Sequence, residues 1–378
     1  MNDIIYLDNS ATTKPCNKAI EYMNKALLTN WGNPSSLHSL GIGAEDHLIS
    51  AKDVCAKALG ARSDEIFFTS GGTEANNLAI NGAVLSRAKR GNRIVTTEIE
   101  HPSVLEPIKA LEQKGFEVIY LKPDTSGTIT EESIKEAITK NTILVSIMLV
   151  NNEIGSIQPI RTAANAIKTV GAPALLHCDA VQAFGKLPIK VSELGVDLLS
   201  FSGHKIHAPK GIGVLYKKKG VSISPLIYGG GQQDAVRPGT EAVPLIAALE
   251  GAILDLLNIK SAYENMQVLK EYATKKLLDT GIVEINSPDN SLPYILNISV
   301  PGFRSETLLH FLDAKGIYVS SGSACSKGKL SYTLLALGLD NKRIDSALRI
   351  SFSRNNSTEE IDKLCDALLE ASKKLKRA

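Results

Sequence analysis

Short apolar runs alternate with longer amphipathic stretches through the first half of the chain. The apolar runs are rich in residues that favour β-strands and lie at 66–69, 93–97, 116–120, 142–150, 174–178 and 198–201. Stretches with helical periodicity stand between several of them, at 74–90, 103–114, 130–138 and 160–170. Strands that alternate with helices predict βαβ units and a mostly parallel sheet. The run at 142–150 is apolar almost throughout, which is typical of a strand covered on both faces.

The pattern changes after about residue 217. A glycine-rich polar stretch at 228–233 precedes a long helical region at 243–278. A smaller set of elements follows, with strands predicted at 294–300 and 347–352 and helices at 305–315 and 358–374. We therefore expect a large α/β domain of residues 15–255. Residues 256–378, joined by residues 1–14, are expected to form a small α+β domain.

Composition and charge exclude several classes of protein. The chain has 378 residues, of which 43% are hydrophobic and 22% charged, as in ordinary globular proteins. The net charge of +2 gives no overall field that would hold nucleic acid or an anionic membrane. The chain contains no run of about 18 consecutive apolar residues, and its first residues do not resemble a signal peptide. These features predict a cytoplasmic protein.

Five cysteines are scattered along the chain, at Cys16, Cys55, Cys178, Cys325 and Cys365. None forms a CxxC pair, so the spacing indicates neither a disulfide framework nor a zinc site. Because five is odd, at least one thiol stays unpaired. The question is whether one of these thiols takes part in chemistry.

Polar motifs follow three of the predicted strands, where parallel sheets bind ligands. The segment Thr69–Glu74 opens a helix with two glycines, which suits phosphate but equally suits a plain helix cap. Asp179 ends a strand, where it could be a helix cap or could face a pyridinium nitrogen. Lys205 lies in a Ser-Gly-His-Lys turn, where it is either a surface lysine or an amine that forms a Schiff base.

The order of these motifs, a phosphate loop, an acid and a lysine, is the layout of a pyridoxal phosphate enzyme. Further motifs stand at residues 6–13, 32–36, 97–101, 150–155, 202–205, 237–240 and 320–325. With these segments in this order, nearly the whole chain resembles the cysteine desulfurases of the NifS/IscS type, within the class V aminotransferase-like family. The resemblance implies a fold-type I transferase with a mostly parallel, seven-stranded type of sheet. It also implies pyridoxal 5'-phosphate as cofactor and a homodimer.

The resemblance assigns cofactor contacts to individual residues. Lys205 resembles the lysine that holds the cofactor as a Schiff base, and Asp179 the acid that pairs with the pyridine nitrogen. His101 would lie over the ring and assist proton transfer, and Gln182 would contact the phenolic oxygen. The phosphate contacts implied within the chain are Gly72, Thr73, Ser202 and His204.

The resemblance also implies contacts with the substrate and with a second subunit. Asn152 would lie near the cofactor and the substrate. Arg349 resembles the arginine that binds the substrate carboxylate, although a strand-end arginine also suits a surface ion pair. Asn9 is expected to help at the same carboxylate. Thr240 resembles the residue that reaches the phosphate of the neighbouring subunit.

Cys325 lies among small and polar residues, which predict an exposed loop. By resemblance it is the nucleophile that takes sulfur from L-cysteine, leaving L-alanine and a persulfide. The persulfide would supply an iron–sulfur scaffold or a tRNA-thiolation protein. No intrinsic metal site is expected, and Cys325 as a transient ligand of a transferred iron–sulfur cluster remains open.

Two other functions fit the same residues. The fold and cofactor also serve aminotransferases and selenocysteine lyase, since a fold does not fix a reaction. An aminotransferase would need an amino acceptor and no thiol. The alternative of another class is a non-catalytic protein that only binds partners.

Overall fold

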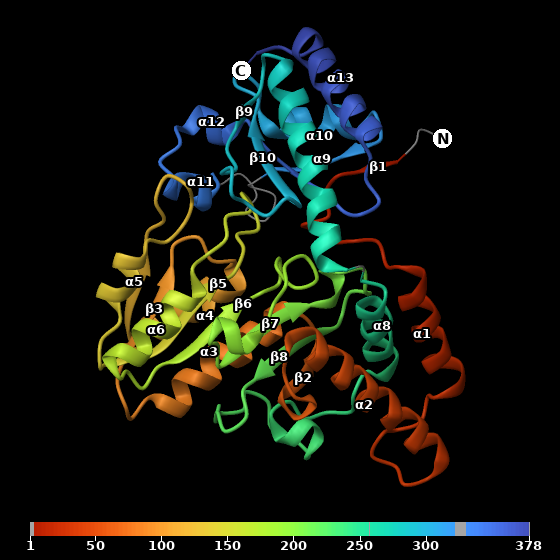
Figure 1. Ribbon diagram of the computed structural model, residues 1–378, viewed down its shortest axis with the longest axis vertical. Coiled ribbons are helices and arrows are strands. Elements are labelled where there is room, and N and C mark those ends of the chain that lie inside the picture. Colours follow the sequence, from red (N-terminus) through yellow and green to blue (C-terminus); the bar gives the residue numbers. More distant parts are fainter. Residues whose placement is uncertain (1–3, 257, 322–329, 378) are drawn as a thin grey trace.

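A seven-stranded sheet forms the centre of the larger part of the molecule. The computed structural model describes residues 4–256, 258–321 and 330–377 (Figure 1). The strands lie in the order β2-β8-β7-β6-β5-β3-β4. Their bounds are β2 (Ile66–Thr69), β3 (Arg93–Thr97), β4 (Glu117–Leu121), β5 (Thr142–Met148), β6 (Leu175–Asp179), β7 (Leu198–Ser202) and β8 (Gly213–Lys217). Strand β8 is antiparallel to β2 and β7, and the other neighbours are parallel. The predicted mostly parallel sheet is confirmed.

Successive side chains of these strands point to opposite faces of the sheet, and helices cover both faces. On one face Phe67, Leu175 and Leu198 pack with the apolar residues of α3 and α4. On the other face Phe68 and Leu199 join a core to which α5, α6 and two further helices, α2 (Ser39–Leu59) and α8 (Val243–Leu254), contribute. Every residue of β5 is buried, as its apolar run predicts. The helices that flank the sheet are α3 (Gly72–Arg87), α4 (Pro102–Glu112), α5 (Glu131–Ala137), α6 (Ile160–Val170) and α7 (Val191–Leu194).

Three further helices pack together beside the sheet: α1 (Asn17–Thr29), α2 (Ser39–Leu59) and α8 (Val243–Leu254), where α8 contacts both of the others (Figure 1). Short 3-10 turns complete this part of the chain at η1 (Ser63–Glu65), η2 (Gly203–Lys205) and η3 (Gln232–Ala235). The turn η2 follows β7 directly, so it places the predicted lysine at the carboxyl edge of the sheet.

The C-terminal residues form a second, smaller sheet in the order β12-β13-β10-β9, in which neighbouring strands are antiparallel. Its strands are β9 (Glu284–Ile285), β10 (Ile295–Ser299), β12 (Ser320–Ser321) and β13 (Ala347–Ser351). Its helices are α9 (Ile259–Asp279), α10 (Ser305–Asp313), α11 (Tyr332–Ala336), α12 (Asn341–Asp345) and α13 (Thr358–Lys374). In Figure 1, α9 runs from the larger part up into this unit.

The start of the chain pairs with its C-terminal part. Strand β1 (Ile5–Tyr6) lies parallel to β11 (Ile317–Tyr318), and Asp8 bridges to Ser351 of β13. The backbone then crosses to the larger sheet, where Thr13 N–H donates to the His204 carbonyl at 2.9 Å. The first residues therefore connect the two sheets.

Several elements differ from the sequence prediction, and the helices α1 and α2 were not predicted at all. The helical region expected at 243–278 is two helices, because α8 ends near Asp255 and a second cap follows at Asn258, whose side chain accepts from the N–H groups of Lys260 and Ser261. Strand β8 was missed, because its few apolar residues follow a glycine-rich turn. Its role as the antiparallel strand between β2 and β7 depends on contacts distant in sequence.

In the part of the chain that the structure describes, no helix is both long enough and apolar enough to span a membrane.

Candidate active site

A cavity of about 380 Å³ opens at the carboxyl ends of the parallel strands, between the large sheet and the C-terminal unit. The predicted site residues that line it are Gly72, Thr73, His101, Asn152, Asp179, Gln182, Ser202, His204, Lys205 and Arg349. They come from positions far apart in the sequence. The carboxyl ends of parallel strands meet at one edge of a sheet, and ligands bind at that edge.

The wall formed by the start of α3 suits an anion. Gly72 and Thr73 begin this helix, whose first backbone N–H groups have no partner within the helix. A Cβ atom on Gly72 would stand 2.9 Å from the side chain of Val181, so the close approach there requires glycine. Ser202 and His204 line the same cavity from β7 and the turn after it.

Lys205 reaches the cavity from the turn after β7. Its Nζ donates to the carbonyl oxygens of Ser10 and Ala11, the second at 2.8 Å. Lys205 is half-buried and lines the cavity, in contrast to the exposed surface lysine that the turn alone equally suits.

Asp179, at the end of β6, is buried and oriented by two donors. Its Oδ1 accepts from the N–H of Val181 at 2.8 Å, and its Oδ2 accepts from Nδ2 of Asn76 at 2.8 Å. Burial raises the pKa of this carboxyl, while those donors and the charges of His101 and Lys205 oppose the rise. A buried acid next to the cavity is suited to stabilise a cation on a bound heterocycle.

His101 is the N-cap of α4, and its ring lines the cavity. Its Nδ1 accepts from the N–H of Ser103 at 3.1 Å and lies 2.8 Å from the Ser103 hydroxyl. Burial lowers the pKa of the ring, partly offset by the negative charge of Asp179. The neutral imidazole is therefore favoured.

Arg349 projects from β13 and presents a donor that no described residue accepts. Its Nη2 pairs with Asp8 at 3.0 Å and its Nη1 donates to the carbonyl of Asn152 at 3.0 Å. Its Nε and the Oδ1 of Asn152 are buried and have no partner among the described residues. Such groups are costly unless a ligand satisfies them. The surface ion pair is excluded, because Arg349 is only 8% exposed.

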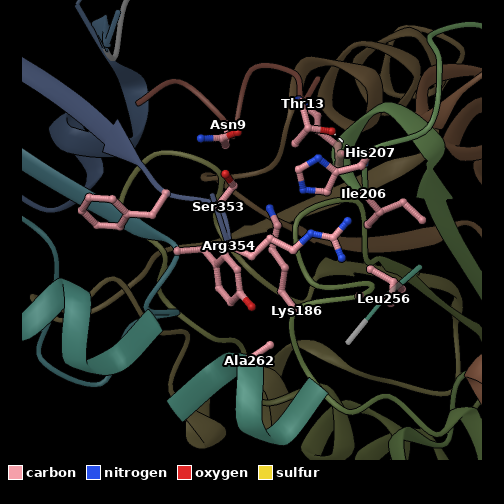
Figure 2. Close-up of a pocket in the computed structure, with 13 residues that line it drawn as sticks. Asn9, Thr13, Lys186, Ile206, His207, Leu256, Ala262, Ser353 and Arg354 are labelled. Carbon is pink, nitrogen blue, oxygen red and sulfur yellow. Dashed lines mark hydrogen bonds between the residues drawn. The ribbon is translucent and has the colours of Figure 1, made fainter. Parts of the chain in front are cut away.

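A second cavity of about 40 Å³ lies beside Lys205, and Figure 2 shows the residues that line it. Lys186, at 5% exposure, is its most deeply buried cationic side chain. Its Nζ donates to Oε1 of Gln182 at 3.3 Å, and Nε2 of Gln182 donates to the carbonyl of Ser10 at 3.0 Å. Gln182 thus stands between the two cavities with both ends of its amide engaged.

Burial, reinforced by the positive charges of Lys205 and Arg349, lowers the pKa of Lys186 from 10.5 to about 7. At pH values between about 7 and 10.5 the amine of Lys186 is protonated in the unfolded chain but not in the folded chain, so the free energy of unfolding rises with pH. Relative to Lys186→Met, we expect the free energy of unfolding of the wild type to rise by roughly 3–4 kcal/mol between pH 7 and 10. Urea unfolding of both proteins at several pH values measures this; a constant difference would contradict it.

Two of the predicted residues that the structure describes, Asn9 and Thr240, do not line the main cavity. The amide of Asn9 donates to the carbonyls of Tyr6 and Ser351 and to Asn356, so it joins the chain start to β13. Thr240 is exposed and lies outside the cavity lining. Cys325 lies outside the described residues. The described residues on either side of its segment do line the cavity: Ser320, Ser321, Ser331 and Tyr332.

Sequence reasoning missed several polar residues that support the site: the half-buried Asp8 and the buried Asn76, Glu100, Ser103 and Lys186. Glu100 is fully buried, and its Oε1 accepts from the N–H of Met148 and the hydroxyl of Thr97, each at 2.8 Å. Burial raises its pKa to about 8.

The arrangement fits pyridoxal phosphate by the chemistry of its groups. A helix start and two polar side chains suit a phosphate, a buried acid suits a pyridinium nitrogen, and an amine at the edge of the cavity suits an aldehyde. The unpartnered Nε of Arg349 and Oδ1 of Asn152 show that the cavity is built for a polar ligand. The fold and the site together define a fold-type I pyridoxal phosphate protein.

Comparisons with known proteins agree with this class. The aminotransferase class-V model matches residues 5–364, so the chain belongs to that family, whose cofactor is pyridoxal phosphate. Cysteine desulfurase IscS of Methanosarcina thermophila is 40% identical over 99% of this chain and 93% of its own length. Cysteine desulfurase IscS of Clostridium botulinum (strain Hall) is 42% identical over 97% of this chain and 94% of its own.

Solved structures agree as well. A NifS-like protein superposes with a TM-score of 0.93 at 38% identity, covering 99% of this chain and 100% of its own. The structure described as SspA in complex with cysteine gives a TM-score of 0.82 at 35% identity, covering 92% of this chain and 98% of its own. The resemblance found in the sequence is therefore confirmed.

Proposed function

We propose that this protein is a cysteine desulfurase, which converts L-cysteine to L-alanine and leaves a persulfide on Cys325. The convergence of Lys205, Asp179, His101 and Arg349 on one cavity carries the proposal. The similarity to proteins named cysteine desulfurase, and to a structure described with cysteine bound, supports it.

Each residue of the site has a separate role in the proposed reaction. Pyridoxal phosphate, when bound, supplies an electron sink that makes the substrate Cα–H acidic. Arg349 binds the carboxylate of the substrate. The negative charge of Asp179 would stabilise a protonated ring nitrogen of the cofactor. The amine of Lys205 takes the proton from Cα. The Cys325 thiolate attacks the substrate sulfur, so an S–S bond forms and the C–S bond breaks. The electron pair of the C–S bond passes to the β-carbon, which is then protonated. The amine of Lys205 returns the proton to Cα, and the product is alanine.

The reaction is tested on the purified protein with L-cysteine. Alanine and sulfide are measured together, with a thiol reductant to release the persulfide, and the modified residue is mapped by mass spectrometry. We expect alanine without any keto acid and the extra sulfur on Cys325. Keto acid in place of alanine would indicate an aminotransferase, and no turnover would indicate a binding protein.

Replacing Arg349 tests its role at the substrate carboxylate. Arg349→Lys keeps the charge but loses the fork geometry and the Nε donor. We expect KM for cysteine to rise roughly tenfold to a hundredfold, because a charge-assisted hydrogen bond contributes about 1.5–3 kcal/mol. Arg304→Lys, at an exposed ion pair with Asp345, is the matched control. Equal KM values for both variants would contradict the assignment.

We also propose a homodimer in which Thr240 reaches the neighbouring subunit. Apolar side chains are exposed along α1, α2 and the turn between them, at Leu28, Trp31, Leu37, Ile42 and Ile49, and Leu37 is 96% exposed. We propose that a second copy of the chain covers this apolar surface. Thr240 is exposed and lies outside the cavity of its own chain, so it is available to a neighbouring subunit.

Light scattering tests this dimer. The wild type should have about twice the 40.5 kDa mass of one chain, and Leu37→Asp with Trp31→Asp should lower it toward one chain. Ile4→Asp, at an exposed apolar residue elsewhere, is the control. A wild-type mass of one chain would contradict the dimer.

The remaining assignments concern domains and partners. We place the domain boundary at 255–256, since α8 ends at Leu254 and α9 begins at Ile259. We assign the protein to the cytoplasm, where a reducing environment keeps Cys325 unpaired. The sulfur acceptor is a protein, an iron–sulfur scaffold or a tRNA-thiolation protein, because a persulfide must be passed to another thiol or cluster.

A further inference from the structure

A single chain of hydrogen bonds runs beneath the main cavity from Asp179 to His101. Nδ2 of Asn76 donates to Oδ2 of Asp179 at 2.8 Å and also to Oγ of Ser103 at 2.9 Å. Oγ of Ser103 in turn lies 2.8 Å from Nδ1 of His101. Asn76 is fully buried, and Ser103 and Asp179 are nearly so. The residue expected at the pyridine nitrogen and the residue expected over the ring are thus joined by two residues that the sequence did not single out.

The direction of each hydrogen bond in this series is fixed by groups that can only donate or can only accept. A backbone N–H can only donate, so the 3.1 Å contact from Ser103 N requires an unprotonated Nδ1 on His101. An ionised Asp179 can only accept, so Asn76 presents its NH2 group to it and to Ser103. Oγ of Ser103 therefore accepts from Asn76, which leaves its own hydrogen to donate to Nδ1.

A neutral imidazole carries one proton, and with Nδ1 accepting from both groups of Ser103 that proton is on Nε2. Among the described residues, no hydrogen bond is made by Nε2, while the ring lines the cavity. A second proton could be added only at Nδ1. There it would face the backbone N–H of Ser103 and break the N-cap of α4.

We infer that His101 acts in the site as a fixed Nε2–H donor and not as a base, and that Ser103 and Asn76 are the positioning residues that hold it in this form. This deepens the proposed function and rests on it for its meaning in turnover. The proton taken from the substrate Cα is left to the amine of Lys205. His101 donates a hydrogen bond to whatever lies over its Nε2, and the same chain holds Asp179 in register with it.

The tautomer is measured directly by NMR on protein labelled with ¹⁵N-histidine, purified with its cofactor. Correlations between ring hydrogens and both nitrogens distinguish the forms, and loss of one set of signals in His101→Gln assigns them. At neutral pH we expect an unprotonated Nδ1 and a protonated Nε2. A proton on Nδ1, or on both nitrogens, would overturn the inference.

Matched variants of Ser103 and Asn76 test the positioning role. Ser103→Ala removes one of the two donors to Nδ1, so we expect the Nδ1 resonance to shift. Ser103→Thr keeps the hydroxyl and should restore the resonance. Asn76→Ala should shift the same resonance, because it frees the hydroxyl of Ser103. An unchanged Nδ1 resonance in both Ser103→Ala and Asn76→Ala would show that the chain does not position the ring.

This measurement separates the inference from the proposed function. The Nδ1 and Nε2 signals report the ring whether or not cysteine is consumed. If turnover fails while the Nε2–H form is present, the proposed function is wrong and the bonding chain stands. If alanine forms while Nδ1 carries the proton, the function stands and the inference is wrong.

Discussion

Cys325→Ser is expected to abolish sulfide release while leaving cofactor binding intact. A serine hydroxyl cannot attack the substrate sulfur under these conditions, because its pKa lies far above that of a thiol. We expect alanine and sulfide formation to fall on the order of 10³-fold or more, as when an enzymatic nucleophile is removed. The visible absorbance of the bound cofactor should stay, since the residues that line its cavity are unchanged. Sulfide assays and absorbance spectra of both proteins measure the two effects.

Cys16→Ser provides the matched control for this substitution. Cys16 is half-buried and accepts from the N–H of Ala19 as the N-cap of α1, a position that serine also favours. The variant should fold and turn over cysteine as the wild type does. Sulfide release at the wild-type rate by Cys325→Ser would contradict the assignment of Cys325 as the nucleophile. Loss of sulfide release in Cys16→Ser would contradict it as well.

Lys205→Ala is expected to have an equally large effect by a different route. The variant lacks the amine that we propose binds the cofactor covalently and takes the substrate proton, so turnover should fall by about 10²- to 10⁴-fold or more. The absorbance of the wild-type cofactor should be lost or displaced, which distinguishes this variant from Cys325→Ser. Spectra with and without L-cysteine, together with alanine measurements, test both statements.

Lys210→Ala is the control for Lys205, because Lys210 lies in the same turn but is exposed. It should retain the spectrum and the rate of the wild type. Added methylamine offers a second check on Lys205→Ala, since a small amine in solution can replace a missing side-chain base. Wild-type spectra and rates in Lys205→Ala would contradict the assignment.

The alternation of apolar strands and amphipathic helices was sufficient to predict the architecture. Buried strands such as β5 are apolar on both faces whatever their neighbours, so their sequence shows their environment directly. Strand β8 was not predictable in this way. Its place beside β2 is set by pairs such as Phe67 with Leu215, which are far apart in sequence. The break near Asn258 was missed because a helix cap is a local hydrogen bond within an otherwise helical pattern.

In the site, too, some residues could be predicted from the sequence and others could not. Lys205, Asp179 and His101 were predictable because each stands in a short motif after a strand, and the order of the motifs resembles one family. The supporting residues were not, because Asn76 and Ser103 acquire their meaning only from partners on other elements. Asn9 also resembles a site residue in its motif, yet its amide is engaged with Ser351 and Asn356.

The sequence by itself determined the family and the cofactor, and it predicted the residues that we propose carry the chemistry, because these depend on residue types at the ends of strands. The tertiary structure decided how those residues are held. Arg349 gains its half-buried partner Asp8 from the other end of the chain, and His101 gains the tautomer that we infer from Ser103 and Asn76. The physical reason is that hydrogen-bond direction and burial are properties of pairs of groups, which a one-dimensional pattern does not contain.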